Sequence, residues 1–108
     1  MPNISPAQAK QMIRLYETNK SLTLKSDIDP DILALSETFD KSEIEELLNQ
    51  KTCVSLRVYY GMSEDLYVHA ILVGVDSNGN DILATNPPII IEEGVRCPPL
   101  CKANAGLN

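Results

Sequence analysis

The chain has 108 residues, of which 44% are hydrophobic and 22% are charged. This length fits one domain, and the composition is close to the globular average, so intrinsic disorder is not expected. The net charge of −6 argues against binding to nucleic acid, whose phosphates must be neutralised by lysine and arginine, and against binding to an anionic membrane surface. Aromatic residues are scarce, so the core must be built from aliphatic side chains.

The N-terminal residues have neither the basic region nor the apolar run of a secretory signal peptide. The longest apolar stretch, residues 70–75, is far shorter than the ~20 residues that a membrane-spanning helix needs. Three cysteines are an odd number, and together with the missing signal they indicate a reducing compartment. We therefore expect a cytoplasmic protein with no membrane partner.

The first expected element is a helix that begins after Ser5 and ends near Asn19. Ser5 is a suitable N-cap, Pro6 fits the first helical position, and Gln8 completes a capping box. Four apolar residues then recur at helical spacing and form one stripe: Ala9, Met12, Ile13 and Tyr16.

A short strand and a second helix are expected next. Residues 34–39 alternate weakly between apolar and polar, which favours a strand. The helix begins at Asp40, where Glu43 three residues later predicts another capping box, and it ends by Gln50 or Lys51. Its apolar face consists of Ile44, Leu47 and Leu48.

Two strands, over residues 53–60 and 66–75, then predict an antiparallel hairpin. The reversal is expected at residues 61–65, so that Tyr60 lies opposite Tyr67. Four apolar residues of the first strand share one face: Val54, Leu56, Val58 and Tyr60.

A second reversal is predicted at Asn78-Gly79, because this dipeptide adopts the positive φ angles of a tight turn. Residues 81–84 should then pair back, and residues 89–91 form a buried or an edge strand. The expected fold is therefore α+β, with two helices packed on a small antiparallel meander of three to four strands.

The most distinctive local feature is a pair of thiols with two prolines between them, in the segment Cys97-Pro98-Pro99-Leu100-Cys101. A polyproline path holds the two Cα atoms about 12 Å apart, whereas a disulfide needs roughly 4.4–6.8 Å and thus a turn at Pro99-Leu100. We interpret residues 97–108 as a C-terminal tail that follows a single domain of residues 1–96. Its Cys-Pro-Pro-Leu-Cys segment is expected to be rigid, and its last seven residues to be flexible by composition. A disulfide or redox role and a metal site remain alternatives.

Zinc-binding side-chain types occur at four positions: Cys53, His69, Cys97 and Cys101. In the expected hairpin register, Cys53 and His69 lie about 17 Å apart, so the four residues cannot share one ion. A partial site that includes Cys97 and Cys101 stays open, but we expect no metal and no cofactor.

No arrangement of residues predicts catalysis. His69 has no matching nucleophile motif and is expected to be a half-exposed sheet residue. The acidic and amide residues from Asp76 to Asn80 imitate the start of a calcium loop, but Asp81 stands where such a loop needs glycine. We therefore expect a hairpin turn there, and a protein that is not an enzyme.

Three segments resemble an uncharacterised family of short flavobacterial-type proteins: residues 56–61, residues 73–82, and Gly94 to Cys101. The shared features are an arginine-containing strand that ends in Tyr-aromatic-Gly, a strand followed by an acidic or glycine turn, and a terminal Gly-x-x-Cys-Pro-Pro-x-Cys. The resemblance covers about half of the chain. It implies that Cys97 and Cys101 matter, without implying an activity.

The sequence thus predicts a non-enzymatic module for protein interaction or self-assembly. It would present a sheet edge, or the candidate site residues Cys97, Pro98, Pro99 and Cys101, to a protein partner or to a second copy. One alternative is a thiol redox or metal-binding protein that acts through the two cysteines. The other is a small acidic inhibitor of the immunity type, with a docking face formed by Glu43, Glu45 and Glu46.

Overall fold

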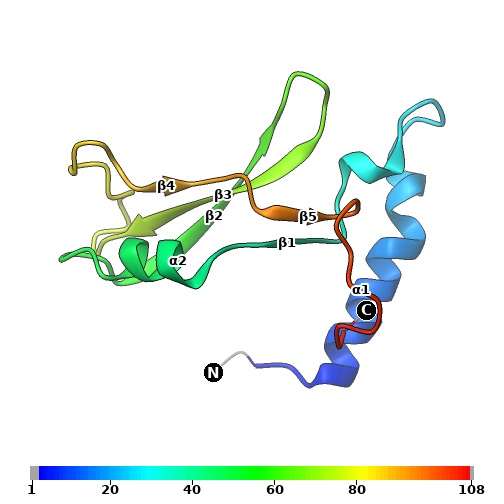
Figure 1. The fold of residues 1–108 in the computed structure, drawn as a ribbon, viewed down its shortest axis with the longest axis horizontal. Helices are drawn as coiled ribbons and strands as arrows, with labels where there is room; N and C mark the ends of the chain where they lie inside the picture. Colours follow the sequence, from blue (N-terminus) through cyan, green and yellow to red (C-terminus); the bar gives the residue numbers. More distant parts are fainter. Residues whose placement is uncertain (1–2, 108) are drawn as a thin grey trace. The chain divides into compact units, whose positions relative to one another are not determined.

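The computed structural model describes residues 3–107. It contains the helices α1 (Pro6–Asn19) and α2 (Lys41–Leu48) and the short 3₁₀ helices η1 (Lys20–Thr23) and η2 (Pro30–Ile32). The strands are β1 (Ser36–Thr38), β2 (Ser55–Met62), β3 (Val68–Val75), β4 (Ile90–Ile91) and β5 (Val95–Cys97). β2, β3 and β4 form a three-stranded antiparallel sheet in that order, and β1 pairs with β5 in a second sheet (Figure 1). The predicted α+β class with a three-stranded meander is confirmed.

The chain forms two compact units. Unit 1 consists of Met1–Ser36 and Arg96–Asn108, and unit 2 is the continuous segment Glu37–Val95. The chain passes between the units inside β1 and again inside β5. The expected division into a single domain of residues 1–96 and a tail of residues 97–108 stays a prediction.

In unit 1, α1 begins as the sequence predicts. The Ser5 hydroxyl accepts the Gln8 N–H at 3.1 Å, and the Gln8 side-chain oxygen accepts the Ser5 N–H at 2.9 Å. The apolar stripe, however, does not enter a core, because no residue of α1 is buried and Met12 is largely exposed. In its C-terminal half, the Tyr16 hydroxyl donates to the Ala34 carbonyl at 2.7 Å.

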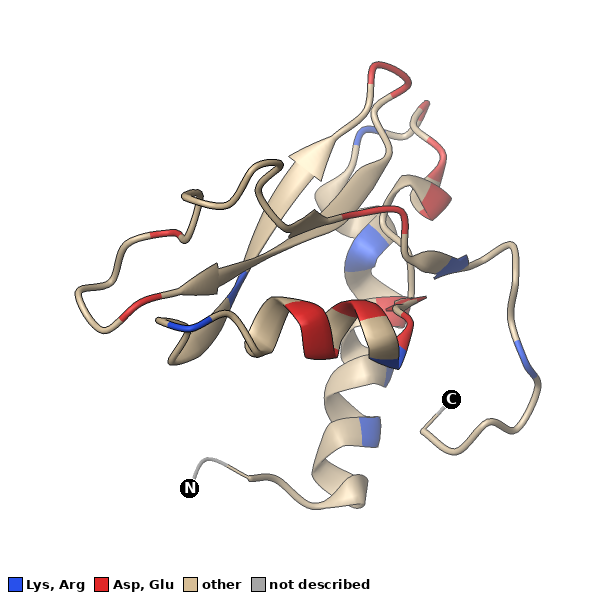
Figure 2. Cartoon of the chain, turned by 60° about the vertical axis from the view of Figure 1, so that its left-hand side comes forward, with Lys and Arg blue, Asp and Glu red and all other residues tan. Residues whose placement is uncertain are grey.

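In unit 2, α2 matches the predicted helix, but its start differs in detail. Asp40 is the N-cap residue, yet its side chain makes no capping hydrogen bond, so the predicted capping box with Glu43 is wrong. The helix starts instead on a backbone bond, in which the Ile44 N–H donates to the Asp40 carbonyl at 3.2 Å. The acidic residues of α2 are exposed (Figure 2).

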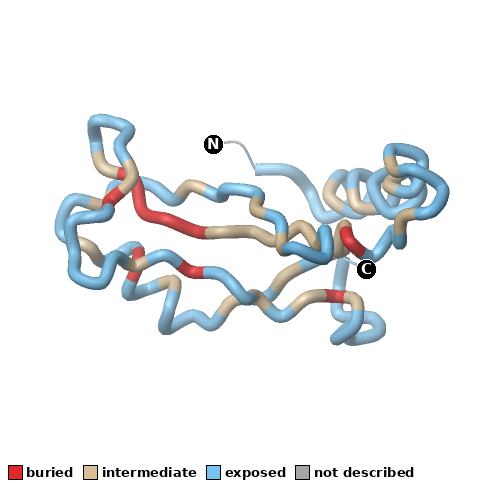
Figure 3. Tube along the Cα trace, turned by 90° about the horizontal axis from the view of Figure 1, so that it is seen from above, coloured by how far each residue is buried: buried red, intermediate tan, exposed pale blue. Residues whose placement is uncertain are grey.

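The core of unit 2 lies between α2 and one face of the three-stranded sheet. Leu47 is fully buried against Leu72 of β3 and Ile91 of β4. Because Leu72 pairs with Ile91 on one side and with Val58 of β2 on the other, all three strands turn these side chains to the same face. The second half of β3 is a continuous buried run (Figure 3).

The hairpin of β2 and β3 is antiparallel as predicted, but its register differs. Tyr60 pairs with Ala70 and not with Tyr67. The reversal lies further along the chain than expected, because the Ser63 N–H donates to the Tyr67 carbonyl at 3.0 Å and the Ser63 hydroxyl accepts the Tyr67 N–H at 3.2 Å. β2 therefore continues through Met62.

Two glycines of this hairpin lie close to the ends of neighbouring side chains, which would have to shift to admit a Cβ. A Cβ on Gly61 would lie 2.6 Å from Cδ1 of Ile71, and a Cβ on Gly74 would lie 2.9 Å from Nε2 of Gln50. Gly61 was expected in the reversal but is a strand residue. Gly74 lets the segment after α2 pack closely on β3.

The second predicted reversal is confirmed. Gly79 adopts a φ of +82°, and its N–H donates to the Asp76 carbonyl at 3.0 Å. The Asp76 carboxylate accepts the N–H groups of Asn78 and Asn80 at 2.9 and 3.0 Å. The carboxylate thus stabilises its own turn, as aspartate does in hairpin turns.

After this turn, the pairing back to β3 is shorter than expected. Asp81 forms an isolated bridge with Val75, and the Ile82 N–H donates to the Gly74 carbonyl at 2.9 Å. The chain then leaves the sheet and returns as β4, the predicted strand at residues 89–91. Two prolines lie between, and a proline has no N–H to donate to a strand.

Candidate functional site

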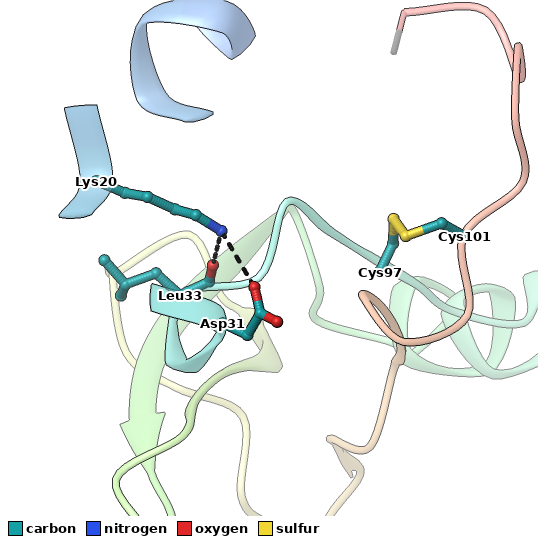
Figure 4. The surroundings of a disulfide bond; sticks show 5 residues. All are labelled: Lys20, Asp31, Leu33, Cys97 and Cys101. Carbon is teal, nitrogen blue, oxygen red and sulfur yellow. Dashed lines mark hydrogen bonds and ion pairs between the residues drawn. A yellow bond between two sulfur atoms is a disulfide. The ribbon is translucent and has the colours of Figure 1, made fainter. Parts of the chain in front are cut away.

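In unit 1, the four predicted site residues lie in one closed turn: Cys97, Pro98, Pro99 and Cys101 (Figure 4). A disulfide joins the two cysteines, whose Cα atoms are 4.7 Å apart. The expected extended path is therefore wrong. The chain turns because the Leu100 N–H finds its acceptor four residues back, at the Arg96 carbonyl, 3.0 Å away.

The two ends of this disulfide differ in exposure. Cys97 is 6% exposed, ends β5, and its carbonyl accepts the Leu35 N–H at 2.7 Å. Cys101 and the neighbouring Leu100 are exposed. In this oxidised form neither sulfur is a thiolate, so the pair does not offer the metal ligands that the alternative interpretation requires.

The turn is anchored through a row of backbone carbonyls, those of residues 31–34. Arg96 donates to the first two carbonyls at 3.0 and 3.2 Å, Lys20 donates to the third at 2.9 Å, and Tyr16 donates to the fourth at 2.7 Å. These contacts join α1, η1, η2 and β5 within unit 1. They also fix the residue that immediately precedes Cys97.

Lys20 is a cation of this group whose side chain is largely removed from solvent. Its side chain is 10% exposed, and its ammonium lies 3.9 Å from the Asp31 carboxylate and 5.9 Å from the centre of the Tyr16 ring. Burial raises the pKa of the Tyr16 hydroxyl above its ordinary value of 10.0, and the nearby Arg96 charge partly opposes this. The sequence does not predict the role of Lys20, because a single lysine in a polar loop gives no sign of burial.

In unit 2, Glu37 completes the hydrogen bonding of β3 beyond the end of β4. Its carboxylate, which is 11% exposed, accepts the Ala70 N–H at 2.7 Å. The other carboxylate oxygen lies 3.7 Å from Nδ1 of His69. His69 is a partly buried residue of β3, as predicted, and the side chain of Glu37 takes the place of a strand neighbour.

A second carboxylate, that of Asp81, joins the turn after β3 to β2. It accepts hydrogen bonds from the Arg57 guanidinium and from the Tyr59 hydroxyl, both at 2.6 Å. Arg57 also donates to the Gly79 carbonyl at 3.2 Å. The only charged side chain of β2 is therefore already paired within its own unit.

The outer edge of β2 has no strand neighbour among the described residues of unit 2. Within residues 3–107, the only strand that pairs with β2 is β3. Four alternating side chains on the α2 side of the sheet are exposed: Leu56 42%, Val58 43%, Tyr60 82% and Met62 62%. α2 packs over β3 and β4, so these side chains extend the apolar face beyond the helix.

The backbone of β2 also offers hydrogen-bonding groups at this edge. In an antiparallel pair, the residues alternate between those that bond to the partner strand and those that point away from it. The Ser63 N–H donates to the Tyr67 carbonyl, so the N–H and C=O groups of the odd-numbered residues of β2 point toward β3. The N–H and C=O groups of Leu56, Val58 and Tyr60 therefore point outward.

The opposite edge of the sheet is protected by contrast. β4 has two residues, is preceded by Pro87 and Pro88, and is followed by Glu92 and Glu93. Short length, prolines and charges are the means by which natural sheets prevent pairing with other strands. β2 has eight residues, no proline and no unpaired charge.

The remaining candidates do not form a site. In the corrected register, Cys53 and His69 lie at opposite ends of the hairpin, roughly 26 Å apart along the strand. The described residues include no group of three or more metal-ligating side chains. His69, Glu92 and Glu93 line a cavity of about 300 Å³, but the two glutamates are exposed. Among the helices of residues 3–107, none has the length and the apolar character of a membrane-spanning segment.

Comparison with known protein families, curated proteins and solved structures finds no match to this chain. The resemblance to short flavobacterial-type proteins therefore stays a prediction.

Proposed function

We propose that this chain is a non-enzymatic protein-interaction module, and that it binds by adding a strand to the outer edge of β2. The observation that carries the proposal is the combination of outward backbone groups with a row of exposed apolar side chains on the same strand. In strand addition, the backbone bonds provide affinity and the alternate side chains provide specificity. The edge of β2 has both.

The predicted alternative surface, the C-terminal segment, is engaged within its own unit. The disulfide closes its first five residues into a turn, and Leu107 lines a small cavity together with Ile13, Arg14 and Leu35. A segment that packs on its own unit is less accessible to a partner than the edge of β2. The sheet edge is therefore the favoured binding element.

The test uses a strand probe and protein tethered to a surface so sparsely that two copies cannot meet. The probe is a short peptide of alternating valine and threonine. The test variant is Val58→Pro, which removes an outward N–H but no bond to β3, and the matched control is Val58→Thr, which keeps that N–H. We expect wild type and Val58→Thr to bind the probe and Val58→Pro to lose binding while its circular dichroism is unchanged.

Equal binding by all three proteins, or no binding by any of them, would contradict the proposal. If wild type binds a probe interrupted by proline as well as it binds the alternating probe, the binding does not use the backbone of β2.

A second candidate function is thiol–disulfide exchange, which the closed Cys97–Cys101 bridge favours. An incoming thiolate would attack Sγ of Cys101, the exposed residue of the pair, form a mixed disulfide and release Cys97 as a thiolate. A second thiol of the partner then completes the exchange, so that the partner becomes a disulfide and this chain a dithiol.

The reduction potential decides between exchange and structure. In glutathione buffers, an exchange protein equilibrates at about −120 to −270 mV, whereas a structural disulfide lies below about −300 mV. A reduction potential below about −300 mV would reject thiol–disulfide exchange as a function. Disulfides are typical of oxidising compartments, so the expected cytoplasmic location stays a prediction. The reduction potential bears on this prediction, because it determines whether the bridge would be reduced in the cytoplasm.

A further inference from the structure

We propose that the strand added to β2 is β2 of a second copy, in antiparallel register around a two-fold axis at Val58. This inference rests on the proposed function and names its partner. The three strands of each copy would then form one continuous sheet through the two β2 strands. An isologous interface of this kind needs a surface that complements itself.

The side chains of β2 meet that requirement on the apolar face. With the axis at Val58, this residue lies opposite itself, and Leu56 lies opposite Tyr60 of the second copy. Aliphatic and aromatic cross-strand pairs of this kind stabilise antiparallel sheets. Leu48 of α2, the helix that packs over this face, is also an exposed apolar residue.

The backbone meets the requirement in the same register. The residues whose N–H and C=O groups point outward are the even-numbered ones. An axis at Val58 places each even-numbered residue opposite another even-numbered residue. Val58 therefore bonds to its own equivalent, and Leu56 bonds to Tyr60 of the second copy.

The strand itself carries no charge that opposes a second copy at this edge, although the whole chain has a net charge of −6. β2 contains no acidic residue, and its single cation, Arg57, is neutralised by Asp81 at 2.6 Å. In the proposed register Arg57 lies opposite Tyr59 of the second copy. No like charges therefore meet between the paired strands.

Sedimentation across a dilution series tests the dimer. The test variant is Tyr60→Lys, which places a charge on the strand edge at an exposed position, and the matched control is Tyr60→Thr, which keeps the preference for strand without a charge. We expect wild type to dimerise, and Tyr60→Lys to dimerise about tenfold or more weakly than Tyr60→Thr.

Cross-linking tests the register, in a Cys53→Ser background that removes the free thiol. Val58→Cys should form an intermolecular disulfide, because hydrogen-bonded partners have Cα atoms about 5.5 Å apart. Tyr60→Cys should not, because its equivalents would lie roughly 13 Å apart.

Three outcomes overturn the inference: a monomer at all concentrations, a dimer unaffected by Tyr60→Lys, or cross-linking at residue 60 instead of 58. If the tethered protein nevertheless binds the strand probe, the edge function stands and the occupant is a different protein. If it binds no probe and the protein is monomeric, both proposals fail.

Discussion

The Asp81 carboxylate accepts hydrogen bonds from two side chains, Arg57 and Tyr59, and their contribution to stability depends on the charge of the carboxylate. The hydrogen bond from Tyr59, followed by that from Arg57, lowers the pKa of Asp81 below its ordinary value of 3.8, against the opposing effect of burial. A lowered pKa in the folded state means that the contribution to stability is fully present above pH 3.8 and is lost as the pH falls toward the folded value.

We therefore predict that Asp81→Asn removes part of the acid sensitivity of the fold. Denaturant unfolding of both proteins from pH 7 to pH 2 should show the free energy of unfolding falling more steeply below pH 4 in wild type. Parallel curves for the two proteins would contradict this assignment. Tyr59→Phe should reproduce part of the effect, since it removes one of the two donors.

Lys20 gives a second prediction at the scale of single residues. Lys20→Met would leave the Leu33 carbonyl without its donor and should lower the free energy of unfolding by about 1–3 kcal/mol. The matched control is Lys25→Met, because Lys25 is exposed and should change stability by less than about 0.5 kcal/mol. Equal effects of the two changes in thermal unfolding would show that the buried ammonium is not structural.

Among elements, β3 depends on a side chain where its neighbour β4 ends. Glu37→Ala would leave the Ala70 N–H without its acceptor, and we predict a loss of about 1–3 kcal/mol in denaturant unfolding. Glu37→Gln keeps an acceptor oxygen and should lose less. If the glutamine variant is as unstable as the alanine variant, the hydrogen bond is not the source of the effect.

The disulfide turn after β5 gives the second prediction for an element. Closing a loop of five residues stabilises a fold by about 2 kcal/mol in the chain-entropy description. The double variant Cys97→Ser, Cys101→Ser should lose about this amount in unfolding measurements, and reduced wild type should match it. No difference between oxidised and reduced wild type would show that the bridge adds no stability.

Elements with local signals were predictable from the sequence. The Ser5 capping box, the alternation in β2 and the Gly79 turn all depend on neighbouring residues. The register of the hairpin was not predictable from the sequence, because it depends on whether Gly61 lies in the turn or in the strand. Cys97 and Cys101 were found by their spacing, but their geometry depends on a turn that proline patterns do not specify.

For the whole molecule, the α+β class follows from the order of helices and strands. The division into two units does not follow from that order. The chain passes between the units inside β1 and β5, where the composition does not change. Contacts such as that of Arg96 with the Asp31 carbonyl join residues far apart in the sequence. From the sequence we expected a free sheet edge but could not say which one. The order of strands in the sheet decides which edge is free, and the sequence does not specify that order.

The most direct test of the β2 edge is amide hydrogen exchange, resolved by residue, in the protein alone at rising concentration and with the strand probe. We predict that the inward amides of Arg57 and Tyr59 exchange slowly throughout. The outward amides of Val58 and Tyr60 should exchange fast in dilute protein and become slow as the edge is occupied. If Val58 and Tyr60 exchange equally fast at every concentration and with the probe, the edge of β2 is not an interaction surface.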